Sequence, residues 1–261
     1  MEKLYVIKIG GNILDDETAL YHFLQSFAEI KEHTILVHGG GKLATRVAES
    51  MGISQQMKEG RRITDEATLD VVTMVYAGAV NKKVVASLQS LGCHAFGVTG
   101  TDGNIIRTHK RINKEIDYGF VGDVDQVNTT LVQGLISLGL SLVVAPITHD
   151  GNGQLLNTNA DTVAQSMAVG LAGMYDVSLV YCFEKNGVLS EASNDASVIK
   201  SVTPAYYQEL KDAGVVTAGM IPKLDNAFLA INAGVRQVII GHGRDLPLLL
   251  INEAGTAITN G

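Results

Sequence analysis

Short apolar runs alternate with helical patterns along the chain, and this alternation predicts an α/β fold with a largely parallel sheet. Strands are expected at Leu4–Ile9, Thr34–Val37, His94–Val98, Leu140–Ala145, Val177–Phe183 and Val235–Ile240. Apolar residues at helical spacing predict helices at Glu17–Lys31, Lys42–Met51, Thr64–Leu91, Asn159–Gly170, Thr203–Gly214 and Ile221–Ala233. Thr64 is the expected N-cap of the longest helix, because acidic residues follow it directly.

The middle of the chain has a different character. Asn104–Val127 is rich in charge, glycine and β-branched residues, which predicts one or more hairpins. No linker rich in proline or serine divides the chain, and the glycine-rich loop at Asn152–Asn159 is the best candidate boundary. We therefore expect an N-terminal lobe of residues 1–155 and a C-terminal lobe of residues 156–261.

Amino-acid composition and charge limit the kinds of protein to which this chain can belong. Of the 261 residues, 46% are hydrophobic and 18% charged, which is typical of a globular protein. The net charge of -7 argues against an extended nucleic-acid surface. The first residues lack the pattern of a leader, and the longest apolar stretch, Gly134–Ile147, is shorter than the ~20 residues of a membrane span. We expect a cytoplasmic protein with no membrane partner, in which Cys93 and Cys182 are buried structural thiols.

Glycine-rich turns follow several predicted strands, at Gly10-Gly11-Asn12, His38-Gly39-Gly40-Gly41-Lys42 and Thr99-Gly100-Thr101-Asp102-Gly103. Such turns expose backbone N–H groups, and where a helix follows they suit an anion, most often phosphate. The Walker A motif is absent because Leu43 follows Gly41-Lys42. Gly39, Gly41 and Ala44 match a relaxed dinucleotide fingerprint, but no acid-ending strand follows at the required spacing of ~20 residues.

Charged residues occupy unusual places near these turns. Lys8 interrupts an apolar strand, and Lys223 stands at a helix start, where a cation opposes the helix dipole. Either could be a solvated surface lysine, and Asp161 could be a capping residue. An anionic ligand would instead explain the two lysines, and Asp161 could hold their ammonium groups in place. Arg62 could clamp a carboxylate bidentately. With no nucleophile elbow and no histidine metal motif, this set favours phosphoryl transfer.

The motifs then point to a family. The chain resembles the N-acetylglutamate kinases of the amino-acid kinase superfamily over essentially its whole length. The residues that carry the resemblance are Ile7-Lys8-Ile9-Gly10-Gly11, Val37-His38-Gly39-Gly40-Gly41, Gly60-Arg61-Arg62-Ile63-Thr64, Asn157-Thr158-Asn159-Ala160-Asp161 and Gly219-Met220-Ile221-Pro222-Lys223.

The resemblance implies an open αβα sandwich around a mainly parallel sheet, with an acylglutamate lobe followed by an ATP lobe. By the family pattern, Lys8 and Lys223 stabilise charge on the transferring phosphoryl group, and Asp161 orients them. Gly11 and Gly40 offer N–H groups to the γ-phosphate. The acylglutamate contacts are Gly40, Gly41, Arg62 and Asn157.

The ATP lobe supplies the expected nucleotide contacts. They are Glu184, Lys185, Asn186, Gly187, Val188 and Thr217. The Mg²⁺ that accompanies ATP is expected to be held mainly by the phosphates, with no metal site on the protein. The segment Tyr181–Val188 departs from the family pattern Leu-[ST]-Asp-Val-x-Gly-Val. Because the chain begins at its first strand, it resembles the arginine-insensitive, homodimeric members.

Three alternatives stay open beside an acetylglutamate kinase of arginine synthesis. The acyl group could be succinyl, with Lys42, Lys58 or Arg61 serving a second carboxylate. The acceptor could be another carboxylate or a carbamate, such as aminoadipate on a carrier protein. The chain could also be a non-catalytic regulatory homologue that binds nucleotide or amino acid.

Overall fold

The computed structural model describes residues 1–58, 61–191, 193–216 and 220–261. Its centre is an eight-stranded sheet in which every neighbouring pair is parallel except the antiparallel pair β13–β14. In spatial order the strands are β12 (Ser201–Val202), β14 (Thr256–Ile258), β13 (Gln237–His242), β11 (Asp176–Phe183), β1 (Lys3–Ile9), β2 (His33–His38), β8 (Ser141–Ala145) and β5 (Ala95–Thr99). The predicted strands are all present.

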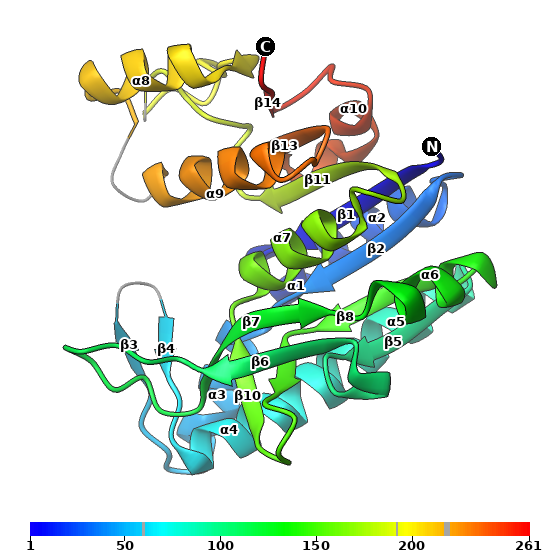
Figure 1. Cartoon of the computed structure of the whole chain (residues 1–261), viewed down its shortest axis with the longest axis vertical. Helices are drawn as coiled ribbons and strands as arrows, with labels where there is room; N and C mark the ends of the chain where they lie inside the picture. The colour runs from blue at the N-terminus through cyan, green and yellow to red at the C-terminus, as the bar shows by residue number, and fades with distance from the viewer. Residues whose placement is uncertain (59–60, 192, 217–219) are drawn as a thin grey trace.

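Helices cover both faces of the sheet, as Figure 1 shows for α7 and α9 on one side and α2 on the other. One face packs against α6 (Thr129–Ser137), α7 (Ala160–Leu171), α8 (Pro204–Asp212) and α9 (Ile221–Asn232). The other packs against α1 (Gly11–Asp15), α2 (Glu17–Ala28), α3 (Gly41–Ser50), α4 (Glu66–Val72), η1 (Thr73–Val80), α5 (Asn81–Ser90) and α10 (Leu246–Leu250). The predicted αβα sandwich is confirmed.

The pattern of β1 explains why the sheet needs two helical layers. Leu4 and Val6 point into one apolar core, while Tyr5 and Ile7 point into the other. A strand buried on both faces reads as a continuous apolar run, which is how parallel strands appear in sequence. Lys8 breaks this run near the carboxyl end of the strand.

Smaller sheets extend from the side of the molecule that carries β8 (Figure 1). The expected hairpin region forms β6 (Ile106–Lys110) and β7 (Val121–Val127), which close a small barrel with β9 (Ile147–His149) and β10 (Leu155–Thr158). A two-stranded hairpin joins β3 (Gln56–Lys58) to β4 (Arg61–Ile63). Short 3₁₀ turns are η2 (Asp102–Asn104) and η3 (Gly243–Asp245).

The structure differs from the sequence-based expectations in three details. Asp65, not Thr64, caps the long helix: its carboxylate accepts from the Thr68 amide at 2.8 Å, while the Thr64 backbone pairs with Tyr118 and Phe120. Cys182 is buried but Cys93 is only half-buried. The expected boundary loop contains a strand, β10, because Leu155–Thr158 pair with β7 and β9.

The long helix is a second segment to consider as a possible membrane span. Glu66–Ser90 has 25 residues and, by length and composition alone, could cross a membrane. In the structure 44% of its apolar window is buried inside the protein, and core helices pass the same test. The helix is therefore weak evidence for a membrane span.

Candidate active site

Register places the glycine turns at one edge of the sheet. Lys8 on β1 lies opposite Val37 of β2 and Tyr181 of β11, so these strands end together. Ligands of open α/β sheets bind at the carboxyl ends of the strands. The turn after β1 and the turn after β2 thus meet where the sequence analysis expected a ligand crevice.

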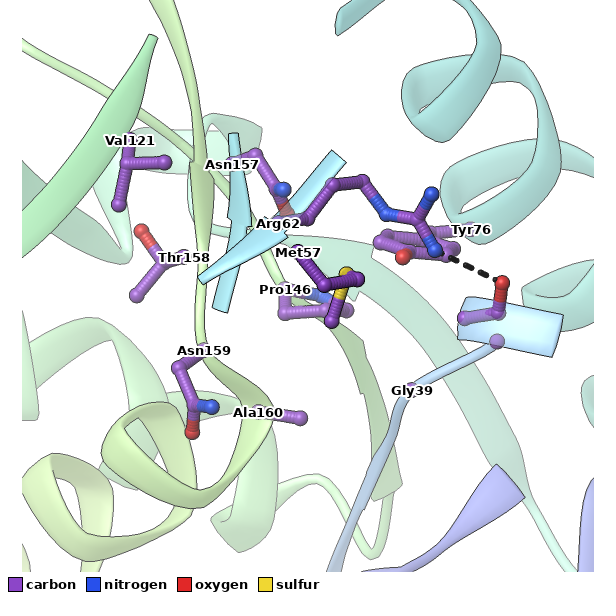
Figure 2. A pocket seen from close by; sticks show the side chains of 12 residues that line it. Gly39, Met57, Arg62, Tyr76, Val121, Pro146, Asn157, Thr158, Asn159 and Ala160 are labelled. Carbon is purple, nitrogen blue, oxygen red and sulfur yellow. Dashed lines mark hydrogen bonds between the residues drawn. The ribbon is translucent and has the colours of Figure 1, made fainter. Parts of the chain in front are cut away.

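The first cavity at this edge lies between the Gly39-Gly40-Gly41 turn, β4, η1 and the amino end of α7. Figure 2 shows the side chains of Arg62, Met57 and Asn157 gathered around it. Its volume is about 190 Å³. It brings together four of the predicted acylglutamate contacts, which are Gly40, Gly41, Arg62 and Asn157.

Arg62 is the only buried charged side chain among the described residues, with 8% of its surface exposed. Its guanidinium donates to the Gly41 carbonyl and the Thr45 hydroxyl, both at 2.9 Å, and to the Gln55 amide oxygen. In the described part of the chain it has no carboxylate partner. A buried cation held only by neutral oxygens is suited to an anionic ligand.

Asn157 also lines this cavity, and a neighbouring threonine holds its side chain. Its amide donates to the Thr64 hydroxyl at 3.0 Å, and that hydroxyl donates to the Arg62 carbonyl at 3.1 Å. The arginine and the asparagine are thereby connected through one threonine. The motif that contains Arg62 and the motif that contains Asn157 are far apart in sequence but form one unit of the site.

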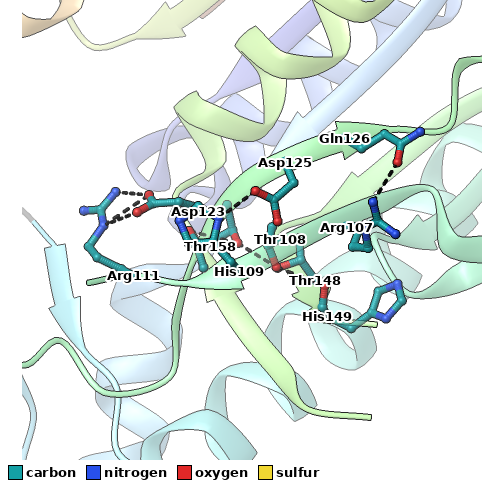
Figure 3. Close-up of polar contacts among 11 residues, drawn as sticks. Arg107, Thr108, His109, Arg111, Asp123, Asp125, Gln126, Thr148, His149 and Thr158 are labelled. Carbon is teal, nitrogen blue, oxygen red and sulfur yellow. Dashed lines mark hydrogen bonds and ion pairs between the residues drawn. The ribbon is translucent and has the colours of Figure 1, made fainter. Parts of the chain in front are cut away.

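The small barrel supports this wall. The hydroxyls of Thr108, Thr148 and Thr158 form a buried chain, with distances of 2.9 and 2.8 Å between neighbours, and Thr158 lines the cavity beside Asn157 (Figure 3). On its outer side, Arg111 pairs with Asp123, and His109 lies 2.6 Å from Asp125. The threonine chain thus connects β10 to β9 and β6, while the outer contacts join β6 and the residue after it to β7.

The glycine turn has a conformation that requires glycine. Gly40 has φ +150°, and a Cβ there would lie 2.9 Å from the Tyr76 ring. The ring belongs to η1, a π-helical segment within the long helix, and Figure 2 shows it beside the Arg62 guanidinium. Burial raises the pKa of the Tyr76 phenol, against the opposing effect of Arg62. Sequence analysis did not identify Tyr76, because its apolar neighbours make it read as a core residue.

A buried histidine holds the turn from the other side. His38 Nδ1 donates to the Gly39 carbonyl at 2.8 Å, and Nε2 accepts from the Asn81 amide at 3.1 Å. Asn81 also donates to the Val143 carbonyl at 2.9 Å. Burial lowers the pKa of His38 to about 4, so the ring is neutral at pH 7. In the sequence His38 had no visible partner; Asn81 lies 43 residues further on.

The second cavity contains the predicted catalytic residues. Lys8, Asp161 and Lys223 line it together with Tyr181, Cys182 and Phe183. Lys8 forms an ion pair with Asp161 at 2.7 Å, which explains how a lysine is accommodated in an apolar strand. Asp161 is placed in the first turn of α7, whose N-cap Asn159 accepts from the Asp161 amide at 2.8 Å.

Lys223 has a different partner. Its ammonium lies over the Phe183 ring, 4.6 Å from the centroid, and not against Asp161. The orientation of Lys223 by Asp161 thus stays a prediction. Burial raises the pKa of the Cys182 thiol to about 12, so this cysteine is a protonated wall residue.

A third cavity lies further along the sheet edge. Among the predicted nucleotide contacts, Lys185, Gly187 and Val188 line it, beside Val216 and Met220. Asn186 is engaged with Asp195 and Arg244, and Glu184 is exposed. Thr217 lies outside the described residues. Gly11 is the first residue of α1 and follows closely on the end of β1. It is therefore near in sequence to Lys8, which lines the second cavity.

The remaining glycine turn is built differently. In Thr99–Gly103, the Asp102 carboxylate accepts from the Thr99 amide at 2.6 Å, so this donor is already used. The turn leads into η2 and not into an α-helix. Among the described residues, no group of three or more His, Cys, Asp or Glu side chains could hold a metal ion.

Comparisons with known proteins agree with this architecture. Residues 3–242 match the model of the Amino acid kinase family. A protein from Cytophaga hutchinsonii named acetylglutamate kinase is 56% identical over 99% of this chain and 98% of its own. An acetylglutamate kinase from Bacteroides fragilis is 55% identical over 92% of each chain. The crystal structure of smu.665 from Streptococcus mutans covers 99% of both chains with a TM-score of 0.79 and 27% identity.

Fold and site together define a protein of the amino-acid kinase type, with three cavities along the edge where the parallel strands end. The chain belongs to the Amino acid kinase family. Within that family its relatives at 50–56% identity carry the name acetylglutamate kinase. The resemblance drawn from the motifs is thereby confirmed.

Proposed function

We propose that this chain is an ATP-dependent kinase that phosphorylates the γ-carboxylate of N-acetyl-L-glutamate to the 5-phosphate, the second step of arginine biosynthesis. The names of its relatives support this activity. The observation that carries the proposal is the pairing of two neighbouring cavities. One presents a buried arginine with only neutral partners, and the other presents two lysines with one carboxylate.

The proposed reaction needs little covalent help from the protein. A γ-carboxylate oxygen attacks the γ-phosphorus of ATP, a new O–P bond forms, and the bond from phosphorus to the ADP oxygen breaks. The attacking carboxylate is ionised at pH 7, since its pKa is about 4.3, so no general base is required. The protein's contribution is alignment and positive charge.

The residues take the following proposed roles. Arg62 binds a carboxylate of the acylglutamate, and Asn157 with the Gly40-Gly41 backbone binds the rest of it. Lys8 and Lys223 stabilise the negative charge that develops on the phosphoryl group, with Asp161 as their orienting acid. Gly11 and Gly40 donate N–H groups to the γ-phosphate.

The nucleotide is proposed to enter as MgATP, its metal ion held mainly by the phosphates. The proposed contacts in the third cavity are Glu184, Lys185, Asn186, Gly187 and Val188, together with Thr217. Residues 156–261 form the ATP lobe, and residues 1–155 the acylglutamate and dimerisation lobe.

The chain is further proposed to be a cytoplasmic homodimer without nucleic-acid or membrane partners. The long helix is the candidate contact, because it carries exposed apolar surface such as Met74, which is 53% exposed. A two-fold axis would bring the same helix of each copy together.

A coupled ADP-release assay over acetylglutamate, succinylglutamate, glutamate and aspartate tests the function. Trapping the product with hydroxylamine, which converts an acyl phosphate to a hydroxamate, separates transfer from ATP hydrolysis. We expect turnover and hydroxamate with acetylglutamate. A tenfold higher kcat/KM for succinylglutamate, about 1.4 kcal/mol, would reassign the acyl group. No turnover with any acceptor would contradict the kinase assignment.

A further inference from the structure

The contact between Lys223 and Phe183 has no role in the function described above. Phe183 is the last residue of β11 and half-buried, and Lys223 stands in the first turn of α9. The ammonium lies 4.6 Å from the ring centroid, well inside the ~6 Å range of a cation–π contact. Both side chains line the cavity that contains Lys8 and Asp161.

The charges in this cavity explain why Lys223 needs a partner. Asp161 is committed to Lys8 at 2.7 Å, and in the described part of the chain Lys223 forms no ion pair. The second ammonium is repelled by Lys8 and also stands at the amino end of a helix, where the dipole is unfavourable for a cation. Without a contact of its own, this flexible side chain would favour positions away from the cavity.

An aromatic ring holds a cation in a way that a carboxylate cannot. A second carboxylate would cancel the charge of Lys223 and leave two acids beside two lysines. The Phe183 ring attracts the ammonium through its quadrupole but carries no net charge. Two lysines and one aspartate therefore keep a net positive charge in the cavity, which suits an anionic phosphoryl group.

We propose that Phe183 is a positioning residue, whose ring holds the Lys223 ammonium in the cavity without neutralising it. This inference rests on the proposed kinase function for its effect on catalysis. Phe183 lies in Tyr181–Val188, the segment where the sequence departs from the family pattern. Holding the Lys223 ammonium is a physical role for the aromatic residue at this position.

Stepwise fluorination of the ring tests this role. Replacing Phe183 by 4-fluoro-, 3,5-difluoro- and 3,4,5-trifluorophenylalanine withdraws electrons from the ring face at nearly constant shape. We expect kcat to fall with each fluorine, by about 2- to 30-fold in total, and KM for acetylglutamate to stay constant. That range corresponds to the loss of a cation–π contact of about 0.5–2 kcal/mol at 1.36 kcal/mol per tenfold.

Two controls separate positioning from packing. In the Lys223→Ala background the fluorinated series should give a flat kcat, because no cation remains to be held. Phe120 is the matched site: Lys110 lies over its ring at 5.3 Å in the small barrel, and fluorinating it should leave kcat unchanged. A flat series in the native background, or an equal slope without Lys223, would overturn the proposal.

An NMR measurement keeps the test independent of activity. Protons above a ring face are shifted upfield, so in protein with ¹³C-labelled lysine the ε-methylene signal of Lys223 should move downfield in Phe183→Leu. Lys223→Ala assigns the signal, and Phe183→Tyr should restore the upfield position. An unchanged shift in Phe183→Leu would refute the contact even if the enzyme turned over none of its proposed substrates.

Discussion

Replacing Arg62 by alanine is the sharpest test of how the first cavity recognises its ligand. Three N–H groups of the guanidinium donate to oxygens of Gly41, Thr45 and Gln55, and the Tyr76 phenol is a further side-chain partner, which leaves at most two of its five donors for a ligand. The protein contacts hold the cation in place before the ligand arrives. The ligand therefore meets a preoriented donor, and most of the loss on truncation should appear as weaker binding.

The size of the effect follows from the type of contact. A hydrogen bond to a charged partner contributes about 1.5–3 kcal/mol, so losing one to a substrate carboxylate should raise KM for acetylglutamate about 10- to 150-fold. KM for ATP should change less than about twofold, since the third cavity does not include Arg62. For Arg62→Lys, KM for acetylglutamate should lie between the values for the native protein and for Arg62→Ala, because lysine keeps the charge but loses the planar fork.

Steady-state kinetics with each substrate varied in turn measures both constants. Arg107→Ala is the matched control: this arginine lies on β6 and contacts Gln126 at 3.1 Å, outside the cavity. An unfolding curve for each variant shows whether a rise in KM comes from weaker binding or from a less stable fold. An equal rise of both KM values in a folded Arg62→Ala protein would refute the assignment of Arg62 to the acylglutamate.

Three further predictions concern other parts of the molecule. Lys8→Ala should lower kcat about 10²- to 10³-fold with little change in either KM, since it removes a donor to developing charge. The pKa of His38 is depressed to about 4 from 6.5, so the free energy of unfolding should rise by roughly 3 kcal/mol between pH 4 and 6.5, measured by urea titration against His38→Asn. Met74→Glu should convert a dimer to a monomer in light scattering, because it places a charge in the proposed contact.

Each of these has an outcome that would contradict it. Near-normal turnover in Lys8→Ala would remove that lysine from the mechanism. An identical pH dependence of stability in His38→Asn would mean that His38 is not buried as a neutral ring. A dimer that persists in Met74→Glu would place the two-fold contact on another surface.

Local sequence patterns were sufficient to predict the α/β class and the main strands and helices. The run Tyr5-Val6-Ile7 and the helical spacing of Leu20, Phe23 and Phe27 each report burial directly, so strands and helices could be placed within a few residues. The barrel strands β9 and β10 have only three and four residues and were not predicted. Their pairing is decided by tertiary contacts, which leave no periodic signal in such short segments.

Cap residues show a similar limit. Thr64 and Asp65 are both good N-caps by type, and the choice between them depends on what else competes for Thr64. Its backbone is already paired with the chain at Tyr118 and Phe120, so the helix begins one residue later. The residues near Thr64 indicate where the helix starts but not which residue caps it, because the segment that pairs with Thr64 lies more than fifty positions away.

From the residues alone, candidate side chains could be named where a charge stood in an improbable place, while the glycine turns and the family motifs supplied the other candidates. Lys8 in an apolar strand and Lys223 at a helix start both stood out, and the structure places them in one cavity. Tyr76 and Phe183 gave no such signal, because an aromatic residue among apolar ones is the usual composition of a core. Their importance comes from the residues beside them, which are Gly40 and Lys223.

The glycine turn shows why the shape of a loop can depend on distant residues. Three successive glycines would be flexible by themselves, since each loses more conformational freedom on folding than any other residue. His38 fixes the Gly39 carbonyl, Asn81 fixes the His38 ring, and Tyr76 leaves room for no side chain at Gly40. Both Tyr76 and Asn81 belong to the long helix, at the π-helical segment and directly after it. A shift in that helix would therefore be transmitted to the backbone that is proposed to bind phosphate.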